Sequence, residues 1–271
     1  MKGNEPSSDS RHGQVRSRRG GIPVMTGDKS PGGAADGPTG GSRGELIGSG
    51  RSADVYALGA EWVVRRYRSA RDTAAEAAVM RRVGSYGYPL PALRPGPFAA
   101  NEMVVRRIEG PTLARALTTG DASAAEGAAL LAALLRRLHR VPPPEGAPAG
   151  HRLLHLDLHP ENVLLSPAGP VVIDWESAGV GPPGLDWASS ALILAEASLR
   201  LDLAPLVELF LPEFLVLAPP ELGSYLTAAR ERRERIPGLT AEERALPGAA
   251  FALLPPLWAD ARARYDAERH P

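Results

Sequence analysis

The chain contains no cysteine among its 271 residues. This excludes disulfide frameworks, thiolate metal sites and cysteine nucleophiles, and it suits a reducing compartment, so we expect a cytoplasmic location. The chain also lacks net charge, because 31 basic and 31 acidic residues cancel. No overall field therefore draws the protein to nucleic acid or to a membrane surface, and any charged ligand must be recognised locally.

Long apolar runs are missing as well. The most apolar stretch, residues 206–218, is interrupted by Glu208, Pro212 and Glu213. It is too broken for a membrane span, and the N-terminal residues lack the apolar core of a signal peptide. We therefore expect a globular protein with no membrane, nucleic-acid or obligate protein partner, whose 44% hydrophobic residues suffice for one large domain or two packed lobes.

Apolar residues are scarcest at the N-terminus. Residues 1–44 hold 11 glycines but only three residues from Leu, Ile, Val and Phe, too few to offset the entropy of ordering, so we predict a disordered tail. Arg16, Arg18 and Arg19 could form a nucleic-acid arm. No aromatic residue accompanies them and opposite charges lie near, so a solvated tail is the favoured interpretation.

From residue 45 onward, short apolar runs alternate with turn residues, a pattern typical of antiparallel strands. We expect strands over residues 45–47, 54–58, 61–67 and 103–108, a hairpin turn at Gly59-Ala60, and a helix over residues 71–83 that ends at Gly84. After Gly110 the pattern becomes mainly helical, with a long helix over residues 123–139 whose Ser123 and Glu126 have capping-box spacing. A sheet-rich lobe over residues 45–108 should therefore precede a helical lobe over residues 109–271.

The strongest signal for chemistry is the segment His-Leu-Asp-Leu-His-Pro-Glu-Asn at residues 155–162, followed by Ile-Asp-Trp-Glu at residues 173–176. Asp157 and Asn162 lie in a predicted loop, and Asp174 ends an apolar strand, so three oxygen-bearing side chains can converge. Such a site suits hard Mg²⁺ and a hydroxyl nucleophile. Each residue alone would be interpreted as a turn former, but the combination favours a site.

The histidines of this segment allow a competing interpretation. On a strand, His155, Asp157 and His159 would point to the same side and could bind a transition metal, as in a metallohydrolase. That reading leaves Asn162 and Asp174 without a role. We therefore favour the first interpretation, in which both histidines orient the loop.

These motifs resemble those of the aminoglycoside phosphotransferase and choline kinase superfamily, whose catalytic loop reads His-x-Asp-x-His-x-x-Asn and whose metal motif reads Ile-Asp-Trp/Phe-Glu. The resemblance extends over approximately residues 45–235. It implies an α+β, bilobal protein-kinase-like fold, with a small antiparallel-sheet N-lobe containing one helix and a larger, mainly helical C-lobe. It also implies ATP and Mg²⁺ as cofactors, and transfer of the γ-phosphate to a hydroxyl of an aminoglycoside-, choline- or sugar-like small molecule.

The same resemblance gives each motif residue a role. Asp157 would be the catalytic base or hydroxyl-orienting group, while Asn162 and Asp174 would hold Mg²⁺. The nucleotide-binding residues would be Gly48, Ser49 and Gly50 in a glycine loop, the cation Arg65, its acidic partner Glu76, and a hinge for adenine from Arg106 to Ile108. Asp186 would brace the catalytic region.

Arg65 departs from the family pattern, which places a lysine there. Arginine keeps the positive charge and can bind a phosphate through two N–H donors. Its planar guanidinium is nevertheless not equivalent to the compact ammonium of lysine. A nucleotide-binding pseudokinase or regulatory module with weak turnover is therefore the alternative function. Taken alone, Arg65 and Glu76 could equally be solvent-facing charges, on an edge strand and on a helix face respectively.

The identity of the acceptor is not encoded in these motifs. A protein acceptor is disfavoured, because no Ala-Pro-Glu motif follows Asp174 and only twelve residues separate it from Asp186. An acidic cleft for an aminoglycoside could use Glu196, Asp202, Glu208 and Glu213. The preferred interpretation of these four residues is that they are solvated helix charges.

Overall fold

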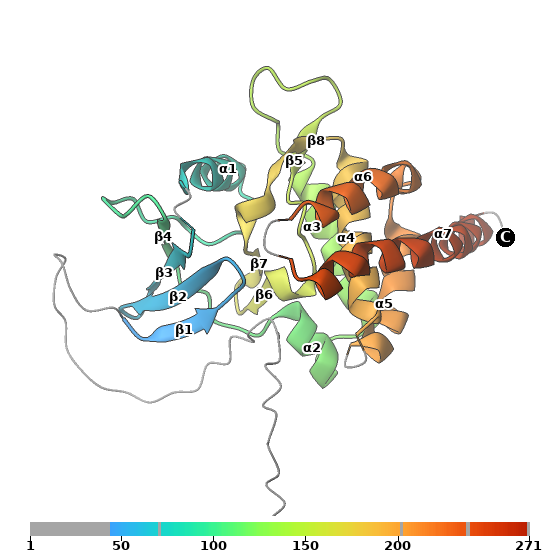
Figure 1. Ribbon diagram of the computed structural model, residues 1–271, viewed down its shortest axis with the longest axis horizontal. Coiled ribbons are helices and arrows are strands. Elements are labelled where there is room, and N and C mark those ends of the chain that lie inside the picture. The colour runs from blue at the N-terminus through green and yellow to red at the C-terminus, as the bar shows by residue number, and fades with distance from the viewer. Residues whose placement is uncertain (1–43, 70–71, 201–202, 237–238, 270–271) are drawn as a thin grey trace, which may run out of the picture.

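The computed structural model describes residues 44–69, 72–200, 203–236 and 239–269, so the predicted tail lies outside these ranges apart from Gly44. Two lobes are visible in Figure 1, with a sheet and a helix on one side and a group of helices on the other. Short strands lie between the two groups. Within the described ranges, no helix combines the length and the apolar character needed to cross a membrane.

The first lobe is a four-stranded antiparallel sheet in the order β1-β2-β3-β4. Its strands are β1 (Leu46–Ser49), β2 (Ala53–Leu58), β3 (Trp62–Tyr67) and β4 (Glu102–Arg106), and α1 (Ala74–Ser85) connects β3 to β4. Because β3 pairs with a strand on each side, Arg65 lies on an inner strand. The interpretation of this residue as an edge-strand charge is therefore wrong.

The predicted boundaries of the first-lobe elements differ from those observed by one to three residues, and two of the differences have a clear cause. Leu58 pairs with Trp62, so the hairpin turn takes three residues, and Glu61 belongs to the turn rather than to the strand. Helix α1 continues through Gly84, and the left-handed residue that follows it is Gly87, with φ of 72°. A residue without Cβ adopts this conformation at little cost, which is why the chain turns there and not at Gly84.

Gly110 fixes the connection between the lobes. Its φ is 139°, and a Cβ at this position would lie 2.1 Å from the carbonyl oxygen of Leu165. Only glycine can therefore occupy the position. The Leu165 amide donates to the Pro111 carbonyl at 2.8 Å, so the chain enters the second lobe already attached to the strand that follows the catalytic-loop motif.

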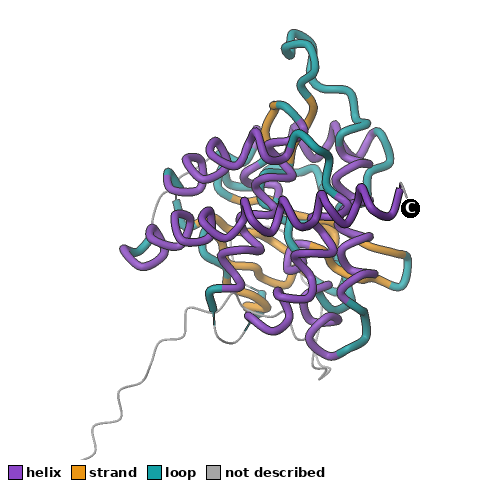
Figure 2. Tube along the Cα trace, turned by 90° about the vertical axis from the view of Figure 1, so that its right-hand side faces the viewer, coloured by secondary structure: helices purple, strands orange, loops and turns teal. Residues whose placement is uncertain are grey.

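The second lobe begins with two helices and then forms two small antiparallel sheets, β5 with β8 and β6 with β7. Its elements are α2 (Leu113–Thr119), α3 (Ala124–Leu138), β5 (Arg152–Leu154), η1 (Pro160–Asn162), β6 (Val163–Ser166), β7 (Gly169–Val172), η2 (Trp175–Ser177), β8 (Gly179–Gly181), α4 (Pro183–Ser198), α5 (Ala204–Leu217), α6 (Leu222–Glu234) and α7 (Ala241–Arg269). Figure 2, seen from the helical side, shows helices running across the molecule in front of the strands. Both chemical motifs lie on connections between short strands.

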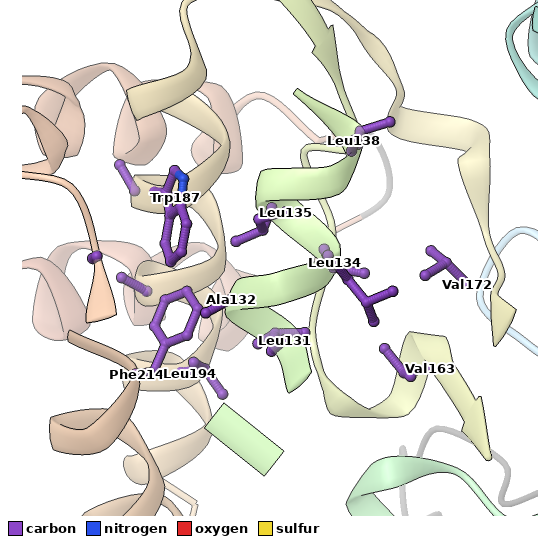
Figure 3. Packing of buried hydrophobic residues seen from close by; sticks show 14 of the residues in the cluster. Leu131, Ala132, Leu134, Leu135, Leu138, Val163, Val172, Trp187, Leu194 and Phe214 are labelled. Carbon is purple, nitrogen blue, oxygen red and sulfur yellow. The ribbon is translucent and has the colours of Figure 1, made fainter. Parts of the chain in front are cut away.

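Helix α3 links the helical core to these strands. The predicted capping box is present, because the Ser123 hydroxyl accepts from the Glu126 amide and the Glu126 carboxylate accepts from the Ser123 amide. Leucines at helical spacing on α3 are fully or almost fully buried. Figure 3 shows them between Trp187 and Phe214 on one side and Val163 and Val172 on the other. The motif-bearing strands thus rest on a packed core, which suits a site that needs fixed geometry.

Candidate active site

The connection from β5 to β6 carries Asp157 and Asn162. It is not a strand, and Leu156 within it has φ of 64°, so side chains do not alternate as the metallohydrolase interpretation requires. His155 instead donates from Nε2 to the carbonyl of Ile173 at 3.1 Å, and its ring lies 4.8 Å from that of Trp175. In the described part of the chain, no group of three His, Cys, Asp or Glu side chains could hold a metal. The competing interpretation is therefore wrong.

Asn162 holds the catalytic loop in shape. Its Nδ2 donates to the backbone carbonyl of Asp157 at 2.9 Å and lies 3.4 Å from the Asp157 carboxylate and 3.2 Å from His159 Nε2. Burial, assisted by Arg233, lowers the pKa of His159 to about 4, so this ring is neutral and accepts the hydrogen bond. No described residue donates to Asn162 Oδ1, which leaves that oxygen for a ligand.

Asp186, near the start of α4, braces the same loop from behind. Its carboxylate is fully buried and accepts from the amides of His155 at 3.0 Å and Leu156 at 2.6 Å, and from His139 Nε2 at 3.0 Å. Burial raises the pKa of Asp186, but these donors outweigh burial and the pKa is lowered overall. An ionised carboxylate thus fixes the left-handed turn at Leu156, a contact consistent with the bracing role that the resemblance implies for Asp186.

Arg65 joins the metal motif to α1. Its Nη2 donates to Asp174 Oδ1 at 2.9 Å and its Nη1 donates to Glu76 Oε1 at 3.2 Å, while the Tyr67 hydroxyl donates to Glu76 Oε2 at 2.6 Å. Glu76 is only 3% exposed, so its interpretation as a solvated charge is wrong. Burial raises the pKa of Asp174, but Arg65 outweighs burial and lowers it.

The glycine loop is held from outside by Arg68, a residue that sequence reasoning missed. Its guanidinium donates to the carbonyls of Gly50 and Arg51, each at 2.7 Å, and to the hydroxyl of Ser49. Because a trans peptide points its amide away from its carbonyl, the amides of Arg51 and Ser52 face away from Arg68. Both residues line the cavity under the loop.

This cavity brings most of the predicted site residues together. Its volume is about 200 Å³, and its lining includes Gly48, Ser49, Gly50, Arg65, Arg106, Ile108, Asn162 and Asp174. Asp157 and Glu76 do not line it, but each contacts a residue that does, namely Asn162 and Arg65. Ser52 also donates to Glu176 at 2.5 Å, so the loop touches the metal motif directly.

Arg233, on α6, contacts Asp157 from the other side and was also missed. Its Nη1 lies 3.4 Å from Asp157 Oδ1 and its Nε 3.0 Å from Glu196 Oε2. A local signal exists, since Leu222, Leu226 and Ala229 form the buried stripe of α6 and Arg233 occupies the next position of that stripe. A cation in an apolar stripe indicates a buried partner, although it does not identify that partner.

The electrostatics of Asp157 differ from those of its neighbours. Its side chain is 23% exposed. Partial burial raises its pKa to about 6, with Arg233 acting against the shift and Asp174 adding to it. A carboxyl group with a pKa near neutrality accepts protons readily at physiological pH, as a general base must.

Of the four carboxylates considered for an aminoglycoside cleft, the three that the structure describes do not form one. Glu196 is buried under Arg233, so its interpretation as a solvated charge is wrong. Glu213 pairs with Arg264 at 3.1 Å, Glu208 is exposed on α5, and Asp202 lies outside the described residues. None of the three described carboxylates lines the cavity under the glycine loop or the larger cavity beside Leu156 and Arg233.

Comparison with known proteins shows the family to which the chain belongs. The model of the phosphotransferase enzyme family matches residues 43–153 and 147–219, which is more than half of the chain. The chain belongs to this family. A search of curated proteins finds no match. The family match ends before α6, so Arg233 and the rest of its helix lie outside the matched region.

Solved structures of phosphotransferases share the fold. An ethanolamine kinase from Plasmodium vivax has a TM-score of 0.56 at 11% identity, covering 80% of this chain and 83% of its own. A choline/ethanolamine kinase family protein from Mesorhizobium loti has a TM-score of 0.51 at 17% identity, covering 82% and 92%. A thermostable aminoglycoside phosphotransferase APH(4)-Ia variant, in complex with AMP-PNP and hygromycin B, has a TM-score of 0.51 at 16% identity, covering 82% and 91%. The predicted bilobal kinase-like α+β fold is confirmed.

Proposed function

We propose that this phosphotransferase moves the γ-phosphate of ATP to a hydroxyl group of a small molecule, with Mg²⁺ as cofactor. The observation that carries the proposal is that Asn162 and Asp174 line one cavity together with the glycine loop and Arg65, and that Asn162 contacts the carboxylate of Asp157. Phosphoryl transfer needs positioned groups and charge stabilisation rather than covalent chemistry by the protein. On this proposal residues 45–108 bind the nucleotide, and residues 109–271 supply catalysis and the acceptor site.

The nucleotide would lie under the glycine loop. The amides of Arg51 and Ser52 and the guanidinium of Arg65, three residues that line this cavity, would then bind phosphate oxygens. At the hinge, the amides of Arg106 and Arg107 already donate to Ala92 and Glu61, whereas that of Ile108 has no backbone acceptor among the described residues. Ile108 is therefore the hinge amide that we assign to the adenine ring, a narrower assignment than the range predicted from the sequence.

The oxygen donors of the site fit Mg²⁺. Asn162 Oδ1 and the carboxylate of Asp174 are hard ligands, and magnesium accepts one or two such groups together with phosphate oxygens. When bound, the ion would neutralise the charge that develops on the transferred phosphoryl group. The complex of the similar APH(4)-Ia variant with AMP-PNP and hygromycin B supports an adenine nucleotide and a small-molecule acceptor.

Asp157 is the group that we assign to the acceptor hydroxyl. Its backbone carbonyl is held by Asn162, and the amides of its two preceding neighbours are held by Asp186. A carboxylate positioned in this way orients the hydroxyl and accepts its proton as the new phosphoester bond forms. Both histidines are then structural supports, since His155 bonds a backbone carbonyl and His159 accepts from Asn162.

The test is Mg²⁺-dependent ATP consumption by the purified full chain against a panel of hydroxyl acceptors. Acceptor-dependent ADP release, together with a phosphorylated product detected by mass spectrometry, is the expected result. Equal ADP release with and without every acceptor, despite tight nucleotide binding, would contradict the proposal.

The pH dependence of turnover should report Asp157. Because Asp157 must be deprotonated to accept a proton and its pKa is about 6, kcat/KM should fall as pH decreases through about 6. Arg233 lowers this pKa, so Arg233→Gln should move the acid limb to higher pH. Steady-state profiles of both proteins, with Arg140→Gln as an exposed control, would measure the shift. An acid limb that stays in place in Arg233→Gln would rule out electrostatic coupling between these two residues.

The Arg65 to Asp174 ion pair favours a second candidate function, a nucleotide-binding pseudokinase with weak turnover. The pair occupies one oxygen of the carboxylate that would hold magnesium. If the pair persisted with nucleotide bound, the metal would lose a ligand. The lysine that the family pattern places here has a compact ammonium instead of a planar guanidinium. It would compete less with the metal for the same oxygen of Asp174.

Variants of Arg65 separate the two functions. We expect Arg65→Lys to keep nucleotide affinity within about threefold because the charge remains, and Arg65→Gln to weaken it by about tenfold or more because a charged phosphate ligand is lost. Fluorescent nucleotide titration measures both effects, and turnover is assayed in parallel. A large gain of turnover in Arg65→Lys, from a wild-type protein with almost none, would favour the pseudokinase.

A further inference from the structure

A second and larger cavity lies beside the catalytic loop, and no role has been assigned to it above. Its volume is about 790 Å³, within the range typical of sites for small organic molecules. Most of its lining is aliphatic, from Leu156, Ala178, Val180, Leu185, Leu192, Ile193, Ala229 and Ile236. Such a surface favours a ligand with an apolar body.

The cavity is next to the group that we assign to the acceptor hydroxyl. Leu156 immediately precedes Asp157, Arg233 contacts the Asp157 carboxylate, and Glu176 belongs to the metal motif, and all three line the cavity. The nucleotide cavity meets the same segment through Asn162 and Asp174. A molecule in the second cavity could therefore present a hydroxyl to Asp157 from the side opposite the nucleotide.

Positive charge dominates the lining. Arg232, Arg233 and Arg235 come from the end of α6, whereas Glu176 is the one carboxylate among the described lining residues. Arg233 is balanced by Glu196 and Asp157. Glu176 is already engaged by the hydroxyl of Ser52.

Arg232 is the arginine of this lining whose guanidinium has N–H donors left to bind a ligand. Its Nη2 donates to the carbonyl of Ser177 at 2.8 Å, which orients the guanidinium without neutralising it, and it pairs with no carboxylate of the described residues. A guanidinium has five N–H donors, so several remain for an anion. Arg235 adds a second positive charge, and its ion-pair partner among the described residues is exposed Glu231 at 3.1 Å.

We propose that this cavity binds the acceptor and that the acceptor is a hydroxyl compound with an apolar body and an anionic group, a carboxylate or a phosphate, bound by Arg232. The proposal rests on the phosphotransferase function proposed above. Cationic acceptors do not fit, because the described lining offers no aromatic ring for a quaternary ammonium and no carboxylate that is free of a partner. Like charges at such a surface penalise the wrong ligand and so provide specificity.

Three compounds that differ only in their terminal group test the charge preference: hydroxyhexanoate, hexanediol and aminohexanol. Each is titrated calorimetrically into the full chain saturated with Mg²⁺ and AMP-PNP. We expect hydroxyhexanoate to bind about tenfold more tightly than hexanediol, and aminohexanol to bind more weakly than either. Hydroxyhexyl phosphate, measured in the same way, shows whether a phosphate or a carboxylate is preferred.

Variants of Arg232 make the test specific. Arg232→Gln should remove most of the tenfold preference for hydroxyhexanoate, and Arg232→Glu should reverse the preference toward aminohexanol. Arg140→Gln removes an exposed positive charge outside the cavity and should leave the preference intact. Aminohexanol should bind Arg232→Glu more tightly than it binds the unchanged protein, and misfolding cannot produce such a gain of binding.

The possible results separate this inference from the proposed function. Faster phosphorylation of hexanediol or aminohexanol than of hydroxyhexanoate would overturn the anionic acceptor and leave the phosphotransferase supported. No binding of any compound, or a preference unchanged in Arg232→Gln, would also overturn it. Binding of hydroxyhexanoate that depends on Arg232, in a protein that transfers no phosphate to any acceptor, would support the anion site and contradict the proposed function.

Discussion

Replacing Asp157 by asparagine should reduce kcat for acceptor phosphorylation by about 10²- to 10⁴-fold, the usual contribution of general acid–base catalysis. Asparagine keeps the size of the side chain but cannot accept the hydroxyl proton. In the structure the Asp157 carboxylate contacts both Asn162, which lines the cavity under the glycine loop, and Arg233, which lines the second cavity. Single-turnover kinetics with a confirmed acceptor would measure the loss without interference from product release.

Two further measurements on Asp157→Asn distinguish a loss of chemistry from a loss of nucleotide binding or of stability. Affinity for AMP-PNP should change little in Asp157→Asn, because the nucleotide cavity does not include this side chain. The melting temperature should not fall, because the charge lost is partly buried and has a raised pKa, so its ionisation already costs free energy in the fold. If Asp157→Asn kept kcat within a factor of about three, Asp157 would have no role in the chemical step.

Replacing Asp174 by asparagine should also be severe, with kcat/KM lower by about 10²-fold or more, the order found when a group that stabilises transition-state charge is removed. The change removes a carboxylate ligand that we assign to Mg²⁺, and of the two carboxylates that now pair with the half-buried guanidinium of Arg65 it leaves Glu76. Asp260→Asn, at an exposed position on α7, is the matched control.

Magnesium titration distinguishes this variant from the first. If Asp174 binds the metal, the apparent affinity for Mg²⁺ falls in Asp174→Asn, and high Mg²⁺ restores part of the activity. The same titration should leave Asp157→Asn inactive, because its missing group is a proton acceptor. An unchanged Mg²⁺ dependence in Asp174→Asn would contradict the metal role.

The local sequence was sufficient to predict features whose interacting residues lie only a few positions apart. The capping box of α3 was predicted because Ser123 and Glu126 are three residues apart and interact within one helical turn. The catalytic loop was predicted because its spacing is read directly from neighbouring residues, while the roles of Asp157, Asn162 and Asp174 remain predictions. The end of α1 was predicted at the wrong glycine. Gly84 and Gly87 look alike in the sequence, and only the folded backbone shows that Gly87 has the left-handed conformation.

The sequence by itself determined the order of a sheet lobe and a helical lobe, the family resemblance and the grouping of the three motif residues. Only the tertiary structure decided that Arg65 lies on an inner strand bound to both Glu76 and Asp174, and that α6 places Arg233 against Asp157 and Arg232 at a second cavity. The physical reason is the range of the interactions. Hydrophobic periodicity fixes which face of a helix is buried, but it does not specify the partner, and Arg233 meets a carboxylate 76 positions away only after α6 has packed.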